Sequence, residues 1–290
     1  MKYVRPATLQ EAVSVLQSSG DKGFILAGGT DLLVRMKSDE FNADLIVDIK
    51  SIESVVGITQ TEHHFRIGAA TTCAEIGEHA GLRVAWPGVV EAANLIGSTQ
   101  IQERCTIAGN LCNASPAADC VPALVAASAR AVVIGPNGIR ELPVESVVNA
   151  PGETSLDKAD IVEAFLLDKR PPNSCDAYLR FIPRTEMDIA VVGAAVNLTL
   201  GEDGLVSSAR VVLGAVAPTV IVVNEAAKAM VGTKLDETAL DALEAACSAA
   251  CQPIDDKRGT VNFRKRVAGV LARRAALNAF TRAGGQKCLQ

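Results

Sequence analysis

A pair of glycines follows a short apolar run near the N-terminus, in the segment Ala27-Gly28-Gly29-Thr30-Asp31-Leu32-Leu33. The apolar residues before it predict a buried strand, and Asp31–Lys37 predict a helix. Where a strand turns into a helix through glycines, backbone N–H groups stay open to an anion, because no Cβ atom blocks its approach. The segment lacks the Lys-Ser/Thr of a P-loop and the third glycine of a dinucleotide fingerprint. Taken alone, it is more typical of an ordinary tight turn, with the Asp31 side chain capping the helix or pointing away.

A second candidate runs from Thr106 to Asp119, in the sequence Thr-Ile-Ala-Gly-Asn-Leu-Cys-Asn-Ala-Ser-Pro-Ala-Ala-Asp. Small residues alternate there with hydroxyl and amide groups, without the period of a strand or a helix. Such a loop can line a polar ligand with backbone and side-chain donors, and Asp119 can accept a hydrogen bond from a hydroxyl group. A surface Ω-loop is the alternative. Because the chain holds two segments of this kind, a ligand site is better supported than it would be by either segment alone.

The cysteines and histidines are not spaced for a metal centre or a catalytic site. Cys105, Cys112 and Cys120 lie seven and eight residues apart, with Cys73 upstream. An iron–sulfur cluster on these residues is conceivable, but no Cys-x-x-Cys pair occurs, so free thiols are the better interpretation. No histidine is placed to activate a serine or cysteine nucleophile. We therefore predict no metal ligand and no catalytic acid, base or nucleophile.

Regular elements frame both segments. Thr8, with Glu11 three residues later, predicts the start of a helix that ends at Gly20. Strands predicted over residues 24–27 and 45–49 complete a β-α-β unit in the first fifty residues. Further on, the pattern predicts an α+β arrangement with hairpins at 55–68 and 131–138, helices at 72–79 and 89–96, strands at 161–167, 190–200 and 208–216, and helices at 235–251 and 261–282.

Residues 169–173, Lys-Arg-Pro-Pro-Asn, are the best linker candidate. With the end of the β-α-β unit, this linker divides the chain into predicted domains 1–54, 55–172 and 173–290. Basic residues on the last helix are predicted to form its solvated face; they are Arg264, Lys265, Arg266, Arg273 and Arg274.

Composition excludes several classes of protein. The chain has 290 residues, a net charge of −5 and only 3% aromatic residues, so clustered positive charge and base-stacking platforms for nucleic acid are not expected. The longest apolar run, Val211–Val223, contains Pro218 and is shorter than the roughly 20 residues of a membrane span. The first ten residues lack the apolar core of an export signal. We therefore expect the eight cysteines to be reduced thiols, as in cytosolic proteins. We predict a cytoplasmic protein without integral membrane contact.

The combination of motifs resembles the FAD-binding medium subunits of molybdenum hydroxylases, the family of the carbon monoxide dehydrogenase flavoprotein and the FAD domain of xanthine dehydrogenase. The resemblance rests on Ala27–Leu33 followed by Met36-Lys37, on Thr71-Thr72, on Thr106–Asp119, on Phe181–Ala190 and on the closing helix from Phe263 to Arg274. It covers nearly the whole chain in order. It implies a two-subdomain FAD-binding fold of the vanillyl-alcohol-oxidase and CO dehydrogenase flavoprotein type, followed by a C-terminal α/β domain with an antiparallel sheet and helices.

The resemblance also implies which residues hold FAD. The two segments would hold the pyrophosphate from two sides, Ser115 and Asp119 would reach ribityl or phosphate-side hydroxyls, and Arg184 would approach the isoalloxazine from the C-terminal domain. One departure is Ala108, where the family often has glycine, so a close backbone approach there requires a negative φ. The implied cofactor-binding residues are Leu26, Ala27, Gly28, Gly29, Thr30, Asp31, Leu32, Ala70, Thr71, Ile101, Thr106, Ala108, Gly109, Asn110, Cys112, Ser115, Pro116, Asp119, Ile161, Val162 and Arg184.

By the same resemblance, the chain is the electron-transfer subunit of a heterotrimeric molybdenum hydroxylase. A large partner would carry molybdopterin and a small partner two [2Fe–2S] clusters, assembled as a dimer of heterotrimers. Electrons would pass from the clusters through FAD to NAD⁺, a quinone, oxygen or another acceptor. Three alternatives remain open: a nucleotide-binding regulatory module without flavin redox chemistry, a scaffold that only docks partner subunits, and a self-sufficient flavin oxidase.

Overall fold

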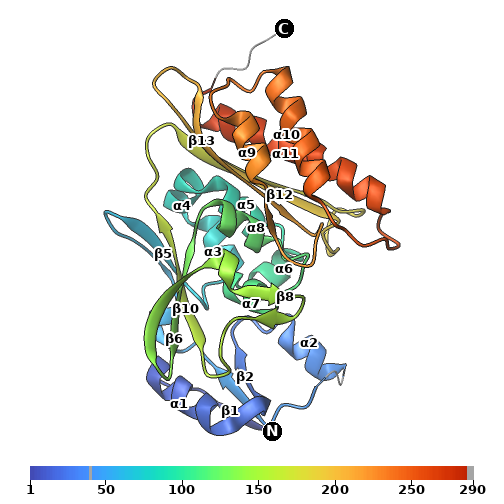
Figure 1. The fold of residues 1–290 in the computed structure, drawn as a ribbon. Coiled ribbons are helices and arrows are strands. Elements are labelled where there is room, and N and C mark those ends of the chain that lie inside the picture. Colours follow the sequence, from blue (N-terminus) through green and yellow to red (C-terminus); the bar gives the residue numbers. More distant parts are fainter. Residues whose placement is uncertain (39–40, 286–290) are drawn as a thin grey trace.

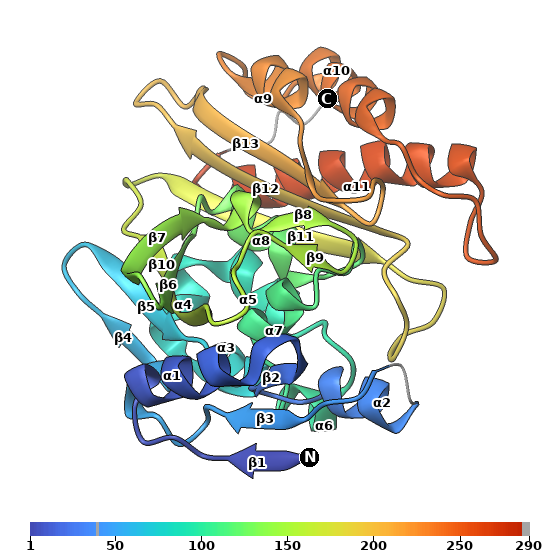
Figure 2. The ribbon, with the colours of Figure 1, turned by 60° about the horizontal axis from the view of Figure 1, so that its bottom comes forward.

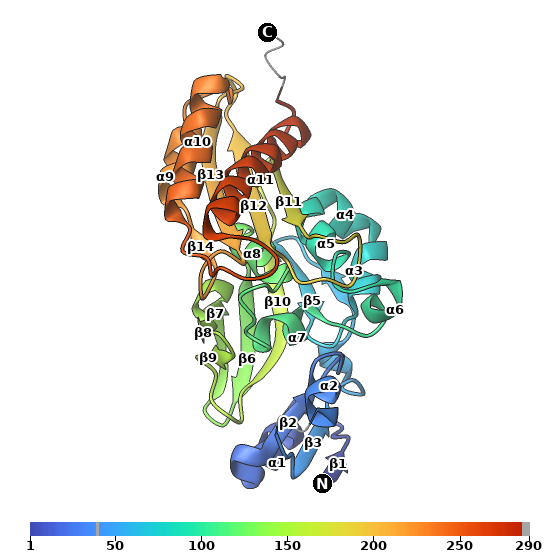
Figure 3. The ribbon, with the colours of Figure 1, turned by 90° about the vertical axis from the view of Figure 1, so that its right-hand side faces the viewer.

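Three parts follow one another along the molecule, as Figure 1 shows for the computed structural model, which describes residues 1–38 and 41–285. A small sheet lies at the N-terminal end, a larger sheet with short helices lies in the middle, and a sheet covered by long helices lies at the far end (Figure 3). In the part of the chain that the structure describes, no helix is long and apolar enough to cross a membrane.

The N-terminal part is a parallel three-stranded sheet with the order β1-β3-β2, formed by β1 (Lys2–Val4), β2 (Gly23–Leu26) and β3 (Leu45–Asp48). Helix α1 (Leu9–Ser19) packs on it (Figure 2), and α2 (Leu32–Lys37) follows β2. Helix α1 begins where predicted, because Oγ1 of Thr8 accepts from the N–H of Glu11 at 3.2 Å. The predicted β-α-β unit is confirmed. The edge strand β1 was not predicted, because three residues are too few for a periodic pattern.

The middle part is built on an antiparallel sheet in which one strand joins two hairpins. The hairpins are β4 (Ile58–Gln60) with β5 (His64–Gly68), and β6 (Arg130–Gly135) with β7 (Gly138–Pro143). Strand β10 (Ile161–Asp168) pairs with β5 on one side and β6 on the other. Both hairpins are confirmed. A small ribbon of β8 (Val148–Ala150) and β9 (Glu153–Thr154) follows, and single 3₁₀ turns occur at Gly20–Lys22, Glu53–Val55 and Val144–Ser146.

Short helices connect the two hairpins: α3 (Cys73–Glu78), α4 (Ala80–Ala85), α5 (Pro87–Ala93), α6 (Thr99–Gln102), α7 (Ile107–Cys112) and α8 (Cys120–Ala126). Helix α7 corrects the prediction that 106–119 has no helical period. Its buried residues Ile107, Ala108 and Leu111 lie on one face, and Oγ1 of Thr106 caps it by accepting from the N–H of Gly109 at 2.9 Å. Six residues are too few for a period to stand out among the small residues around them.

The C-terminal part is an antiparallel sheet of β11 (Ser174–Phe181), β12 (Val192–Leu200), β13 (Val206–Gly214) and β14 (Ile221–Val222). Helices α9 (Asn224–Met230), α10 (Glu237–Ala250) and α11 (Val261–Arg282) follow it (Figure 1). Residues of β12 alternate between two cores: Ala194 and Val196 pack with the long helices, whereas Ala195 packs with the middle part. The sheet is therefore buried on both faces, and its second face joins it to the rest of the molecule.

One basic residue of the last helix is buried, which corrects the prediction of a solvated basic face. Arg264 is 3% exposed; its Nη1 donates to the carbonyl of Val191 at 2.8 Å, and its Nη2 pairs with Oδ1 of Asp256 at 2.7 Å. Arg273, by contrast, forms ion pairs with acidic residues of α10. The helical spacing of basic residues does not distinguish a solvent-facing guanidinium from one that caps backbone carbonyls inside the fold.

Replacing Arg264 by leucine is expected to lower the free energy of unfolding by about 3 kcal/mol, since it leaves a buried carbonyl and a carboxylate without their donor. Arg266, two residues later on the same helix, is exposed, so Arg266→Leu should change the free energy by less than about 0.5 kcal/mol. Urea unfolding of the two variants provides the measurement. Equal losses in both would contradict the role of Arg264.

Candidate functional site

A cavity of about 290 Å³ lies where the N-terminal and middle parts meet. Most of its lining comes from three segments: β2 with the turn into α2, helix α7 with the residues next to it, and the first two residues of β10. The lining residues are Gly23, Phe24, Ile25, Ala27, Gly28, Gly29, Thr30, Asp31, Leu32, Arg35, Ile49, Ala69, Ile96, Cys105, Thr106, Ala108, Gly109, Asn110, Cys112, Asn113, Lys158, Ile161 and Val162.

At Gly28 the first segment packs against Arg104 and Cys105, the two residues that directly precede the second segment. A Cβ atom at this position would lie 2.2 Å from the carbonyl oxygen of Arg104 and 2.8 Å from Cα of Cys105. Only glycine permits this approach. The next residue, Gly29, has φ +80°, a conformation that side chains disfavour. Glycine is therefore required at both positions by the backbone itself, and the close contact brings both predicted segments to one cavity.

Helices α3 and α7 begin side by side, and α7 lines the cavity. Thr72 and Thr106, the residues before α3 and α7, form an antiparallel bridge, and the N–H of Cys73 donates to the carbonyl of Cys105 at 2.9 Å. Each threonine caps its own helix. The first turn of a helix presents N–H groups that have no carbonyl partner within the helix. Together with the turn at 28–32, the start of α7 supplies the donors that a bound anion needs.

A test of fit comes from Gly109 on α7. A Cβ atom built on this glycine would meet a single atom within 4 Å, Oγ1 of Thr106 at 3.2 Å. The space beside the Gly109 backbone is thus left open on the side of the cavity. Ala108 has no positive φ, so its Cβ is accommodated in α7 and the departure from the family pattern does not disturb the backbone. A phosphate-bearing ligand fits at Gly109, because the missing Cβ leaves room beside the backbone of α7.

Part of the cavity lining is apolar. Phe24, Ile49 and Ile96 belong to it, with Ile161 and Val162 of β10. Phe24 also packs against Phe41, with ring centroids 4.3 Å apart. An apolar surface next to a group of backbone donors suits a ligand with a flat ring system and a charged linker. The cavity therefore has the two kinds of surface that a dinucleotide such as FAD requires.

Most of the predicted cofactor-binding residues lie on this cavity. Those that line it are Ala27, Gly28, Gly29, Thr30, Asp31, Leu32, Thr106, Ala108, Gly109, Asn110, Cys112, Ile161 and Val162. The lining does not include the predicted residues Leu26, Ala70, Thr71, Ile101, Ser115, Pro116, Asp119 and Arg184. Leu26, Ala70 and Thr71 are buried beside lining residues, and Thr71 donates to the carbonyl of Gly57 at 3.0 Å. Their contact with FAD stays a prediction.

Sequence reasoning missed several apolar residues that line the cavity. Phe24, Ile25, Ile49, Ala69 and Ile96 have the pattern of ordinary core residues, and nothing in their types distinguishes a cavity wall from a packed core. Lys158 lines the cavity as well, and it pairs with Asp21. The signal that could have located Lys158 is its position three residues before Ile161, which the resemblance implies as a cofactor-binding residue.

Asp31 does not cap α2, since its side chain makes no capping hydrogen bond. Desolvation raises the pKa of its carboxyl group, and the Arg35 charge opposes this rise. An acidic group beside an anion is unfavourable unless its charge is compensated. Arg35, which also lines the cavity, supplies a compensating charge on the same helix.

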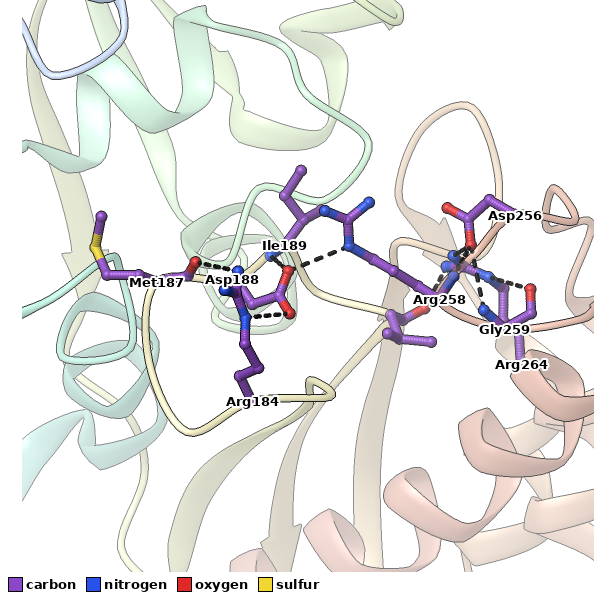
Figure 4. Close-up of polar contacts among 9 residues, drawn as sticks. Arg184, Met187, Asp188, Ile189, Asp256, Arg258, Gly259 and Arg264 are labelled. Carbon is purple, nitrogen blue, oxygen red and sulfur yellow. Dashed lines mark hydrogen bonds and ion pairs between the residues drawn. The ribbon is translucent and has the colours of Figure 1, made fainter.

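Arg184 lies in the loop between β11 and β12 (Figure 4). Its Nε pairs with Oδ2 of Asp188 at 3.2 Å, and Nε of Arg258 pairs with the other oxygen of the same carboxylate at 3.2 Å. A hydrogen bond from the N–H of Ile189 and the two guanidinium groups lower the pKa of Asp188. The pair with Arg258 ties the loop to the segment before α11. The Arg184 side chain is 69% exposed and lies at the surface.

The cysteines give no support to an iron–sulfur cluster. Cys73, Cys105 and Cys120 are buried, whereas Cys112 is exposed and lines the cavity. The hydrogen bond with the thiol of Cys73, together with burial, raises the pKa of Cys105, so the neutral thiol is its stable form. Among residues 1–38 and 41–285, no three His, Cys, Asp or Glu side chains are arranged to hold a metal ion.

Comparisons with known proteins agree with the resemblance. Two family models match: FAD binding domain in molybdopterin dehydrogenase over residues 1–167, and CO dehydrogenase flavoprotein C-terminal domain over residues 177–279. The carbon monoxide dehydrogenase medium chain of Afipia carboxidovorans is 33% identical over 97% of each chain, and the xanthine dehydrogenase FAD-binding subunit of Escherichia coli O157:H7 is 29% identical over 98% of this chain and 97% of its own.

The fold agrees with that of a solved relative. The reconstituted CO dehydrogenase from Oligotropha carboxidovorans superposes with a TM-score of 0.93 and 32% identity, covering 97% of this chain and 98% of that one. The expected α+β fold, with a C-terminal sheet and helices, is thereby confirmed. The chain therefore belongs to the FAD-binding flavoproteins of the molybdopterin dehydrogenases, and it is an oxidoreductase subunit whose cofactor is FAD.

Proposed function

We propose that the chain is the FAD-carrying electron-transfer subunit of a heterotrimeric molybdenum hydroxylase. Two relatives support this assembly, since each is named the medium chain of a carbon monoxide dehydrogenase, which implies a larger and a smaller chain beside it. The partners would be a large molybdopterin subunit and a small subunit with [2Fe–2S] clusters, as a dimer of heterotrimers. The domain division at residues 54 and 172 and the cytoplasmic location stay predictions.

The observation that supports this function best is that two glycine-containing segments line one cavity. Backbone N–H groups of residues 28–32 and of the start of α7 would hold the FAD pyrophosphate, with Asn110 beside them. Ile161 and Val162 would pack against one of the ring systems. Bound FAD accepts electrons and passes them on one or two at a time. The side chains around it bind and orient the cofactor, and the function needs no acid or base among them.

The test is the visible spectrum of the purified chain, with its heat-released cofactor compared with FAD and FMN standards. We expect noncovalent FAD at about one per chain, because a single cavity holds both the backbone donors and the apolar lining residues. Co-purification with one larger and one smaller subunit would support the heterotrimer. A colourless chain that takes up no added FAD but keeps its partners would contradict an electron-transfer role and favour a scaffold.

A further inference from the structure

Asp119 is a buried carboxylate where the middle and C-terminal parts meet. It is 7% exposed; its Oδ1 accepts from the hydroxyl of Tyr178 at 2.9 Å, and its Oδ2 accepts from Nη1 of Arg180 at 2.8 Å. The Arg180 side chain is 4% exposed, and Tyr178 is 2% exposed. Asp119 directly precedes α8, and both partners lie on β11. A buried charge pair therefore connects the middle part to the C-terminal sheet.

The loop before Asp119 is tied both to the cavity and to the C-terminal part. The N–H of Cys120 donates to Oδ1 of Asn110 at 3.0 Å, and Asn110 lines the cavity. The N–H of Ala215, which follows β13, donates to the carbonyl of Pro116 at 2.8 Å. Residues 113–120 thus run from the cavity wall, at Asn113, to the charge pair on the C-terminal sheet.

We propose that Arg180 and Tyr178 are positioning residues for the cofactor site: they hold Asp119, and through it the loop 113–120 and the Asn110 amide, in the arrangement that completes the cavity. The proposal rests on the proposed function, because it assigns the cavity to FAD. Among the described residues that line the cavity, neither Arg180 nor Tyr178 occurs, so both act through Asp119. The C-terminal part is then required for cofactor binding without lining the cavity.

The charge of Arg180 is the critical element. Burial raises the pKa of Asp119, and the Arg180 charge and the Tyr178 hydrogen bond oppose that rise. These two groups face the carboxylate, and Cys120 lies next to it and acts on Tyr178. Without Arg180, a buried Asp119 has to bind a proton or move into water. In a variant without Arg180, the loop should therefore keep its place at a pH below the raised pKa of Asp119 and lose it at a higher pH.

The experiment compares the full chain with Arg180→Met, Asp119→Asn and the double variant, by titrating the apo-proteins with FAD from about pH 5.5 to 8.5 and following flavin fluorescence. The dissociation constant of the wild-type chain should change little. That of Arg180→Met should rise by up to about tenfold per pH unit once Asp119 ionises. The double variant should lose this pH dependence, because its asparagine carries no charge.

Two results would overturn the proposal. If Arg180→Met binds FAD with wild-type affinity at every pH, Arg180 has no positioning role. If Arg180→Met loses affinity equally at every pH, and adding Asp119→Asn does not restore it, Arg180 contacts the cofactor itself. If Arg180→Met does not fold, Tyr178→Phe removes one hydrogen bond and should weaken binding by about two- to tenfold, more at high pH. Unchanged binding in Tyr178→Phe would then count against the proposal.

Failure of the proposed function is distinguishable from failure of the positioning role. A wild-type chain that binds no FAD would contradict the proposed function. The role of Arg180 in holding Asp119 can then be tested by thermal unfolding. The thermal midpoint of Arg180→Met should then fall with rising pH, while that of the double variant stays level. A level midpoint in both variants would overturn the positioning role as well.

Discussion

Replacing Gly109 by valine is expected to abolish FAD binding while leaving the fold intact. The added Cβ meets only Oγ1 of Thr106 within 4 Å, and Gly109 lines the cavity, so the valine side chain is expected to extend to where the cofactor would contact the backbone. Valine is no worse than glycine as a helix residue, so α7 should keep its stability. We expect affinity to fall by at least about 100-fold, or about 3 kcal/mol. A fluorescence titration with FAD measures it, and circular dichroism checks the fold.

A matched control exists on α4. Gly81 lies in a helix of the same length as α7 and away from the cavity lining, and a Cβ there would lie 3.3 Å from the His79 ring. Gly81→Val should bind FAD as the wild-type chain does. Normal binding by Gly109→Val would mean that FAD does not approach α7. The same change at Gly29 is less informative, because φ +80° makes any side chain there strain the turn itself.

Replacing Arg170 by methionine is expected to destabilise the fold by about 3–5 kcal/mol, the cost of leaving a buried charge unpaired. Nη2 of Arg170 pairs with Oδ1 of Asp176 at 2.6 Å, and the guanidinium lies 3.9 Å from the centre of the Trp86 ring. Asp176 is 3% exposed. Trp86 is the single tryptophan of the chain, so its fluorescence reports urea unfolding and the loss of the guanidinium.

The loss should depend on pH. Burial raises the pKa of Asp176 above its ordinary value of 3.8, and the Arg170 charge opposes this rise. Removing Arg170 raises the pKa further, so the deficit of Arg170→Met is complete above the raised pKa and shrinks as the pH falls toward 3.8. Asp176→Asn in the same chain should relieve most of the deficit. Lys228→Met, at an exposed ion pair, should cost less than about 1 kcal/mol; a similar cost in both would refute the argument.

Local patterns in the sequence predicted the elements better than their assembly. The hairpins and α1 follow from capping residues, turn glycines and apolar periods, all of which act within a few residues. The pairing of β10 with β5 and β6 joins residues nearly one hundred positions apart for β5, and no local pattern encodes such a partner. Arg170 shows the same limit. Its neighbours in Lys-Arg-Pro-Pro-Asn are typical of a linker, yet tertiary contacts with Trp86 and Asp176 bury it.

The part of the candidate site that could be predicted from the sequence is the part where the backbone conformation requires a particular residue type. Gly28 and Gly29 are needed for close approach and for φ +80°, so their presence in the sequence carries information. The apolar wall has no comparable signal, because Ile49 and Ile96 would suit any core. Asp119 was predicted to accept from a hydroxyl group of the ligand, and this stays a prediction. In the structure its Oδ1 accepts from the hydroxyl of Tyr178, fifty-nine residues away, a protein partner that only the fold could reveal.

The position of β10 sets the order in which the protein can mature on the ribosome. Until residues 161–168 have been synthesised, β5 and β6 each have an unpaired edge, and open edges are prone to pair with other chains. The cavity also lacks one wall until then, and Asp119 lacks its partners until β11 has followed. Cofactor insertion is therefore a late step that needs more than half of the polypeptide outside the ribosome. We therefore expect a nascent chain stalled before this point to bind chaperones and not flavin.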